Sequence, residues 1–258
     1  MLPVISIVTL HFNRPMFTSQ TLPRLLETTD VPFELILLHN SDESTDATAV
    51  SQYLETFEHA KLKVSERSLL RKTQTIRFKK NLGTSAAKNI GTKFMSEYTK
   101  AVMFLDDDTL LPKHWASRTM RLLEDEPKIG LIGFRRHAPF EPSLQLRCSK
   151  SGIYWDNLGG VNPGAYALVV RKDTFLEAGD FWDKFIYGWE DTDYAIKVSL
   201  TGKYTCVIYP DRVIDLDDAD AVWKKPIWED EEAQELATRR FIKCQADAVN
   251  RRCRNSQK

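Results

Sequence analysis

A short apolar run followed by three consecutive aspartates constrains this chain more than any other feature. Ala101 to Leu105 is too short for a free-standing helix and predicts a buried strand, and Asp106, Asp107 and Asp108 follow it directly. Adjacent carboxylates disfavour one another's ionisation, and their oxygens suit a hard divalent ion such as Mg²⁺ or Mn²⁺. Because ligands of open α/β sheets bind at the carboxyl ends of strands, the triplet predicts a cation site there. A solvated acidic turn ahead of a helix is the alternative.

Strand and helix patterns alternate before this run. Val4 to Leu10 is rich in β-branched residues and predicts a first strand, followed by a helix to about Glu27. Phe33 to Leu38 predicts a second strand, and the helix after it is expected to end near Phe57. Alternation at this spacing favours right-handed crossovers between parallel strands. We therefore expect an α/β fold with a mainly parallel central sheet and helices on both faces.

The second half of the chain is less regular. Three further strands are expected at Lys128–Phe134, Ala165–Val170 and Tyr204–Tyr209. The stretch 135–160 is rich in proline and glycine, and such a long irregular segment is more typical of a functional loop or hairpin than of a linker. An acidic cluster after Trp189 predicts the start of a helix that ends at glycine 202.

Composition excludes some classes of protein. The 258 residues allow one large domain or two small ones, and 36 Lys and Arg balance 36 Asp and Glu, so the net charge favours neither nucleic acid nor an acidic surface. The four cysteines contain no C-x-x-C pair, which favours reduced thiols. No apolar run has the length of a membrane span, and no signal-peptide pattern is present. We expect a cytoplasmic protein.

Two segments are nevertheless basic. One is 67–80, within which Thr75 to Phe78 predicts a short strand, and the other is the helical C-terminal stretch 226–258. Cations at a helix end complement its dipole, so a solvated C-terminal helix is one interpretation. Binding to a polyanion such as DNA or to an anionic membrane surface are the others.

Five segments between Val4 and about Asp217 share their order and spacing with one enzyme family. They are Ser6–Pro15, Asn40–Asp46, Asn81–Gly91, Leu105–Asp108 and Gly164–Tyr194. Together they resemble the family 2 glycosyltransferases of the GT-A fold, whose signatures include Asn-x-Gly-x-x-x-Ala-Arg-Asn-x-Gly and Asp-x-Asp. The resemblance implies a Mn²⁺- or Mg²⁺-dependent enzyme that transfers sugar from a nucleoside diphosphate sugar with inversion. Residues 1–110 would form its nucleotide-sugar-binding half, 111–225 its acceptor-binding half, and 226–258 an appended basic helix.

The resemblance also implies roles for individual residues. Asp191 is the expected catalytic base, and Asp108 is the expected metal ligand, with Asp215 or Asp217 in place of a late histidine. Trp189 and Glu190 are expected to contact the acceptor, although Trp189 also fits a half-buried core position. The residues expected to bind the nucleotide sugar are Thr9, His11, Asn13, His39, Asn40, Lys88, Asp106 and Asp107. An acid in the first turn of a helix can also serve as a cap, and the helix dipole is expected to lower the pKa of Asp191.

The sequence departs from the family pattern at two of these positions. His39 stands where members often have an aspartate that contacts uracil, and Lys88 replaces the usual arginine. UDP is the expected nucleotide because the first two strands still match, with weaker discrimination for uracil. The Gln-x-x-Arg-Trp motif of processive members is missing from the sequence, which favours transfer of a single sugar.

The sequence allows more than one acceptor and more than one class of reaction. A glycan is the expected acceptor, and a modified base in DNA is the alternative because of the basic segments. A nucleotidyltransferase would also use a sugar nucleotide and a metal, but its glycine-rich N-terminal loop is missing near residues 9–20. A non-catalytic sugar-nucleotide-binding protein would not need both the aspartate triplet and Glu190-Asp191.

Overall fold

The computed structural model describes most of the predicted sheet. The described residues are 2, 4–12, 14–40, 69–135, 144–150, 152–157, 163, 166–185, 188–210 and 213–216. Asn13, Asp217, the helix expected near Phe57 and the C-terminal segment 226–258 lie outside them.

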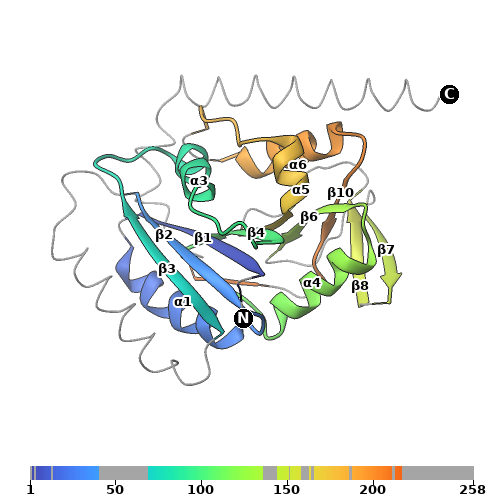
Figure 1. Ribbon diagram of the computed structural model, residues 1–258, viewed down its shortest axis with the longest axis horizontal. Coiled ribbons are helices and arrows are strands. Elements are labelled where there is room, and N and C mark those ends of the chain that lie inside the picture. Colours follow the sequence, from blue (N-terminus) through green and yellow to red (C-terminus); the bar gives the residue numbers. More distant parts are fainter. Residues whose placement is uncertain are drawn as a thin grey trace.

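A nine-stranded sheet forms the centre of the molecule (Figure 1). Its order is β3-β2-β1-β4-β9-β6-β10-β8-β7. In chain order the strands are β1 (Ile5–His11), β2 (Phe33–His39), β3 (Leu70–Arg77), β4 (Ala101–Asp106), β6 (Ile129–Phe134), β7 (Leu144–Ser149), β8 (Gly152–Asn157), β9 (Ala167–Arg171) and β10 (Thr205–Ile208). All run in one direction except β9 and β8, each antiparallel to both of its neighbours. The expected α/β fold with a mainly parallel sheet is confirmed.

Two regions differ from the sequence prediction in extent. β3 runs from Leu70 to Arg77, longer than the short strand expected from Thr75 to Phe78. The strand lies at the edge of the sheet and is only partly buried, so it carries polar and basic side chains. Its sequence therefore lacks the apolar pattern by which a buried strand is recognised. In the irregular stretch, the antiparallel pair β7 and β8 forms the hairpin that was one of the two expectations.

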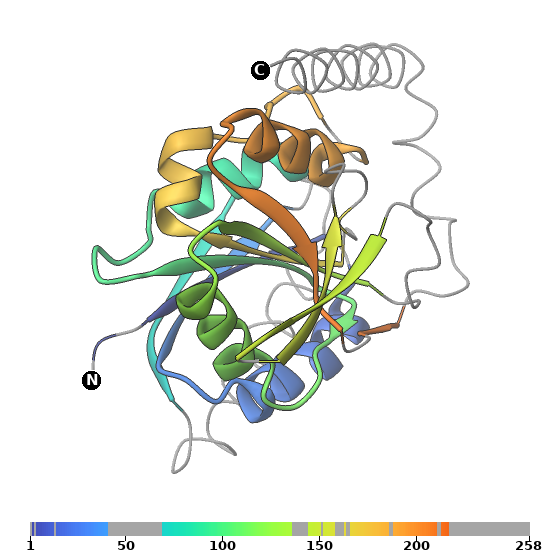
Figure 2. The same cartoon turned by 90° about the vertical axis from the view of Figure 1, so that its right-hand side faces the viewer.

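Helices cover both faces of the sheet, as expected. Figure 2 shows one group above the sheet and one group below it. The helices α1 (Pro15–Thr28) and α4 (Trp115–Asp125) pack into one apolar cluster with the sheet, whereas α3 (Thr84–Thr92), α5 (Lys172–Ala178) and α6 (Glu190–Leu200) pack into the other. Covered faces explain why β1 and β2 are buried along their whole length.

The alternation of side chains along β4 decides where the aspartates point. Met103 and Leu105 lie in the cluster with α1, whereas Val102 and Phe104 lie in the cluster with α3 and α6. Successive side chains of a strand face opposite sides, so Asp106, the last residue of β4, faces α3 and α6. The next residue leaves the strand toward α1, and the triplet is therefore divided between the two faces.

Gly133 of β6 provides a test of the packing. A Cβ atom at this position would lie 1.9 Å from the backbone oxygen of Pro163, so an alanine requires a shift of the backbone. Overpacking of this kind costs about 1–3 kcal/mol. We expect Gly133→Ala to lower the free energy of unfolding by that amount, measured by urea denaturation. Unchanged stability would contradict the close approach of residues 133 and 163.

Candidate active site

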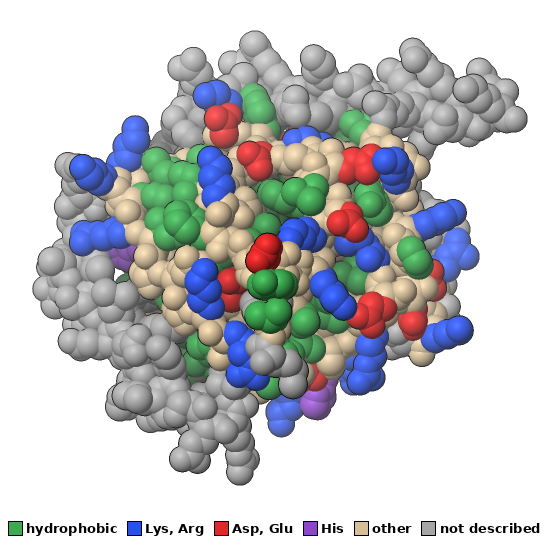
Figure 3. Space-filling model, in the orientation of Figure 1, with side chains coloured by type: hydrophobic (Ala, Val, Ile, Leu, Met, Phe, Trp, Pro, Cys, Tyr) green, Lys and Arg blue, Asp and Glu red, His purple; other side chains and the backbone are tan. Residues whose placement is uncertain are grey.

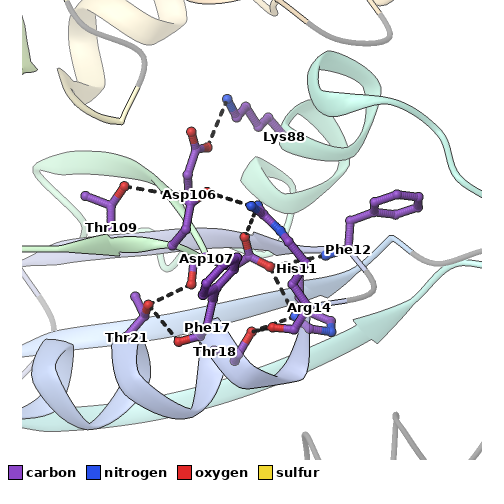
Figure 4. Close-up of polar contacts among 11 residues, drawn as sticks. His11, Phe12, Arg14, Phe17, Thr18, Thr21, Lys88, Asp106, Asp107 and Thr109 are labelled. Atoms are coloured by element: carbon purple, nitrogen blue, oxygen red, sulfur yellow. Dashed lines mark hydrogen bonds and ion pairs between the residues drawn. The ribbon is translucent and has the colours of Figure 1, made fainter. Parts of the chain in front are cut away.

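Several predicted donor-site residues lie at the carboxyl ends of β1, β2 and β4, which are hydrogen-bonded neighbours. His11 is in register with His39 across β1 and β2, and Leu10 is in register with Asp106 across β1 and β4. Figure 4 shows Asp106 beside Lys88 of α3, and Asp107 beside His11 and Arg14 at the start of α1. Segments more than 80 residues apart in sequence thus form one polar cluster.

Asp107 is buried and is held from the α1 side. Arg14 donates from Nη2 to one of its carboxylate oxygens. The other oxygen lies 3.2 Å from His11 Nδ1 and accepts a bond from the Phe12 backbone N–H at 3.4 Å, while Thr21 donates to the backbone oxygen of Asp107 at 2.6 Å. These contacts give Asp107 a part in fixing the loop after β1. Its contact with a sugar nucleotide stays a prediction.

Asp108 joins three segments of the chain. Its carboxylate accepts a 2.7 Å bond from Arg14 Nη1, and its backbone oxygen accepts a 2.8 Å bond from the N–H of Leu216. The short strands β5 (Thr109–Leu110) and β11 (Ile214–Asp215) pair so that Asp215 is in register with Thr109. The backbone therefore places residue 215 beside the triplet, and its role as a metal ligand stays a prediction.

Arg14 is the site residue that sequence reasoning missed. Its guanidinium bridges Asp107 and Asp108, and these carboxylates, with Asp106, raise the pKa of Arg14 although burial opposes the rise. The sequence feature that could have identified Arg14 is its position as a cation shortly after the first strand, at the same edge of the sheet where the aspartate triplet was expected.

Asp106 faces the opposite side and contacts a buried cation. Lys88 Nζ lies 4.0 Å from Asp106 Oδ1 and 3.1 Å from Glu190 Oε1, and the Lys88 side chain is 3% exposed. Burial raises the pKa of Asp106 to about 8, although 35% of its side chain remains exposed. The charge of Lys88 opposes this rise, whereas the neighbouring carboxylates of Asp108, Glu190 and Asp107 add to it. The cluster of carboxylates thus favours the binding of positive charge.

Glu190 and Asp191 are the first two residues of α6, and both are buried. Two residues with positive φ precede them, Gly188 at 80° and Trp189 at 66°. A left-handed conformation is unusual for a bulky residue, and here it turns the chain sharply into the helix. Trp189 is 44% exposed and lies outside both apolar clusters, so it is not a core residue.

The expected lowering of the Asp191 pKa is wrong. Burial, followed by the adjacent carboxylate of Glu190, raises the pKa of Asp191 to about 6, and the backbone bonds at Thr192 and the charge of Lys88 only partly compensate. The helix dipole acts on an acid that is largely removed from water, and desolvation is the larger effect. Asp191 still ionises at neutral pH.

The remaining predicted donor residues lie on β1 and β2 or just after them. Thr9 and His11 are buried on β1, and the His11 ring centroid lies 5.2 Å from that of His39. Burial, then the charges of His11 and Arg77, lowers the pKa of His39 to about 4, so its imidazole is neutral at pH 7. Asn40 donates to Asn81 Oδ1 at 2.8 Å and accepts from the Leu82 N–H at 2.8 Å, and it thereby joins the end of β2 to the start of α3.

The described part of the chain contains neither a preformed cluster of metal ligands nor a membrane-spanning helix. No three His, Cys, Asp or Glu side chains there converge as a self-sufficient metal site. Among the same residues, no helix is long and apolar enough to cross a bilayer.

Solved structures show the same fold. A mannosyltransferase from Pyrobaculum calidifontis, PcManGT, in complex with GDP-Man and Mn²⁺, matches with a TM-score of 0.60 and 13% identity over 97% of this chain and 75% of its own. TarS 1–349 from S. aureus matches with a TM-score of 0.57 and 16% identity over 82% of this chain. GalNAc-T7 with UDP, GalNAc and Mn²⁺ matches with a TM-score of 0.59 and 14% identity over 84% of this chain and 45% of its own. The present chain spans 59% of the length of TarS 1–349.

Sequence comparison gives the family. No curated protein matches the sequence. Residues 6–166, which contain β1, β4 and the aspartate triplet, match the profile of "Glycosyl transferase family 2", and this stretch is more than half of the chain. The chain therefore belongs to glycosyl transferase family 2 and shares the GT-A fold of these solved glycosyltransferases.

Proposed function

We propose that the protein transfers a single sugar from a nucleoside diphosphate sugar to an acceptor hydroxyl, with inversion and with the help of a divalent metal ion. One observation carries the proposal. Two acidic groups from distant parts of the chain, the end of β4 and the start of α6, meet at Lys88, which contacts Asp106 at 4.0 Å and Glu190 at 3.1 Å. Such an arrangement suits a reaction in which a donor on the β4 side meets an acceptor on the α6 side.

Asp191 would act as the base in this reaction. Its carboxylate would accept the proton of the acceptor hydroxyl while the hydroxyl oxygen attacks the anomeric carbon and the bond to the diphosphate oxygen breaks on the opposite face. This displacement inverts the anomeric centre. An acid with a pKa near 6 is suited to the task, because it is ionised at neutral pH and retains basicity.

The residues present fit a divalent cation if the donor supplies further oxygens. Mg²⁺ is commonly held by one or two carboxylates together with substrate phosphates, so three converging protein side chains are not required. We assign this role to Asp108 and Asp215, and the backbone pairing of Asp215 with Thr109 supports the assignment. A bound ion would neutralise charge that develops on the leaving diphosphate. PcManGT and GalNAc-T7, whose structures contain Mn²⁺, support the proposal by analogy.

UDP is the proposed nucleotide, with Thr9, His11, Asn13, His39 and Asn40 around its base and ribose. TarS 1–349 has been solved with UDP and with UDP-GlcNAc, whereas PcManGT carries GDP-Man. The neutral imidazole of His39 lacks the charge of an aspartate, so we infer weaker discrimination for uracil than in members that carry the acid.

A glycan hydroxyl is the proposed acceptor, with the exposed Trp189 stacking on its ring and Glu190 holding a hydroxyl. The surface near β3 favours a second candidate, a polyanion such as DNA that carries a modified base. Arg71, Lys72 and Arg77 of β3 are exposed, as are Lys79 and Lys80 after it. Figure 3 shows Lys and Arg side chains around an apolar patch over the loop that connects β3 to α3.

The product released on addition of acceptor tests the reaction class. A glycosyltransferase releases free nucleoside diphosphate, a nucleotidyltransferase releases pyrophosphate, and a non-catalytic binding protein releases neither.

The nucleotide can be tested without an acceptor. Because a ligand that binds only the native state stabilises it, UDP, GDP and TDP are compared by thermal shift with and without Mn²⁺. We expect UDP to stabilise most and Mn²⁺ to increase its effect. Binding of GDP or TDP at least tenfold tighter than UDP, about 1.4 kcal/mol, would contradict the assignment of UDP.

A further inference from the structure

Lys88 is a buried cation that connects the two halves of the proposed site. It lies on α3, its side chain is 3% exposed, and its ammonium contacts Glu190 at 3.1 Å and Asp106 at 4.0 Å. The ammonium also lies 5.9 Å from the centroid of the Phe181 ring. A buried ammonium is costly unless it is paired, so these contacts hold both the lysine and its partners in place.

The next residue of α3 binds the same part of the chain. Asn89 Nδ2 donates to the backbone oxygen of Phe181 at 2.9 Å, and the backbone N–H of Phe181 donates to Asn89 Oδ1 at 2.9 Å. Lys88 and Asn89 therefore hold both ends of the segment 181–190, which leads into α6. α3 itself lies close against the sheet, because a Cβ at its Gly91 would be 2.7 Å from Val8 Cγ1.

We propose that Lys88 is a positioning residue that holds the Glu190–Asp191 pair against the donor side of the site and keeps Asp191 in its working charge state. The inference rests on the proposed function, in which Asp191 is the base. It differs from the donor-binding role that the family resemblance implies for this position, because the ammonium is already committed to two carboxylates and is shielded from solvent.

The charges around Asp191 explain why a cation is needed. Glu190 and Asp193 lie on α6 itself, Asp106 approaches Lys88 from β4, and Lys88 comes from α3. Burial opposes a charged Lys88, but Glu190, Asp106 and Asp191 outweigh it and raise its pKa, so the ammonium persists at neutral pH. Without it, the carboxylates would repel one another and Asp191 would bind a proton more readily.

The test compares Lys88→Met, which removes the charge at similar length, with Lys88→Arg, which keeps it. Lys93→Met is the matched control, since Lys93 is exposed at the end of the same helix. The carboxyl titration of Asp191 is followed by NMR in protein labelled with ¹³C-aspartate, with the signal assigned by Asp191→Asn. In parallel, UDP release from UDP-GlcNAc, with water as acceptor, is measured from pH 5 to 9.

We expect Lys88→Met to raise the titration midpoint of Asp191, because the charge of Lys88 is one of the groups that lower the pKa of this carboxyl. The acid limb of kcat should move to higher pH by the same amount, with UDP and Mn²⁺ binding nearly unchanged. Lys88→Arg should restore most of both properties, and Lys93→Met should match the wild type.

Two results would overturn the inference. One is a Lys88→Met protein whose Asp191 titration is unmoved, and the other is a raised KM for UDP-GlcNAc with kcat and its pH profile unchanged, which would make Lys88 a donor ligand. A shifted titration in a protein that transfers sugar from no donor would instead contradict the proposed function.

If Lys88→Met does not fold, the double variant Lys88→Met/Glu190→Gln replaces the ion pair with neutral groups, which buried sites tolerate better than a lone charge. The inference then predicts that the double variant folds and that its Asp191 titrates within about one unit of the wild type, since the opposing effects of Lys88 and Glu190 are both removed. A double variant that also fails to fold, or a larger shift, would contradict it.

Discussion

Asp191→Asn is expected to fold, to bind the donor and metal nearly normally, and to lose at least a hundredfold in kcat. Asparagine preserves the shape of the side chain at the second position of α6 but cannot accept the acceptor proton. Removal of a general base typically costs about 10²–10⁴ in rate. The measurement is UDP release with the donor that gives turnover, together with the thermal shift produced by UDP and Mn²⁺.

The pH profile sharpens this prediction. A base works only when it is deprotonated, and burial and Glu190 raise the pKa of Asp191 to about 6. The rate of the wild type should therefore fall as the pH falls through about 6, and Asp191→Asn should lack this limb. Asp183→Asn is the control, because Asp183 is an exposed carboxylate shortly before α6, with 59% of its side chain accessible. If Asp191→Asn keeps kcat within a few fold while Glu190→Gln abolishes turnover, the base lies elsewhere in the cluster.

Asp108→Ala is expected to abolish metal-dependent binding of nucleotide. The substitution removes the carboxylate that we assign to the metal, while the backbone oxygen that accepts from Leu216 remains. Arg14 keeps its contact with Asp107, so the loop after β1 should stay in place. At a UDP concentration 100 times Kd, the wild type should gain about 2.7 kcal/mol of stability, and the part of this gain that depends on Mn²⁺ should vanish in the variant.

The measurement is the thermal shift produced by UDP with Mn²⁺ and with EDTA. Asp183→Ala serves as the surface control and should respond as the wild type does. A Mn²⁺-dependent shift that survives in Asp108→Ala would show that this carboxylate is not a metal ligand.

Much of the central sheet was predictable because its strands are locally encoded. β4 extends the expected Ala101–Leu105 strand by a single residue, and β2 and β6 were also expected within one or two residues. These strands are apolar because both faces are covered, so composition and length suffice to recognise them. β3 was recognised only in part, since an edge strand needs fewer apolar residues and lacks that signal.

The site was predictable as a set of residues but not as a set of contacts. The aspartate triplet was marked by its place after a buried strand, and Glu190 and Asp191 by the family resemblance. The folded chain brings Asp106 and Glu190 to the same lysine, Lys88. The pairing of each carboxylate with its cation could not be inferred from the sequence, and Arg14 was overlooked for that reason.

By itself the sequence determined the family, the buried strands of the central sheet and the aspartates that follow β4, because each motif and each buried strand depends on neighbours within a few positions. Only the tertiary structure decided that Asp106 faces Lys88 while Asp107 and Asp108 face Arg14, since Asp106 ends β4 on the face that α3 and α6 cover and the turn after it carries the next two residues toward α1. The pKa of Asp191 was decided in the same way. Proximity to the helix start is local and lowers it, but burial and the placement of Lys88 depend on how α6 packs in the folded chain, and burial is the largest effect.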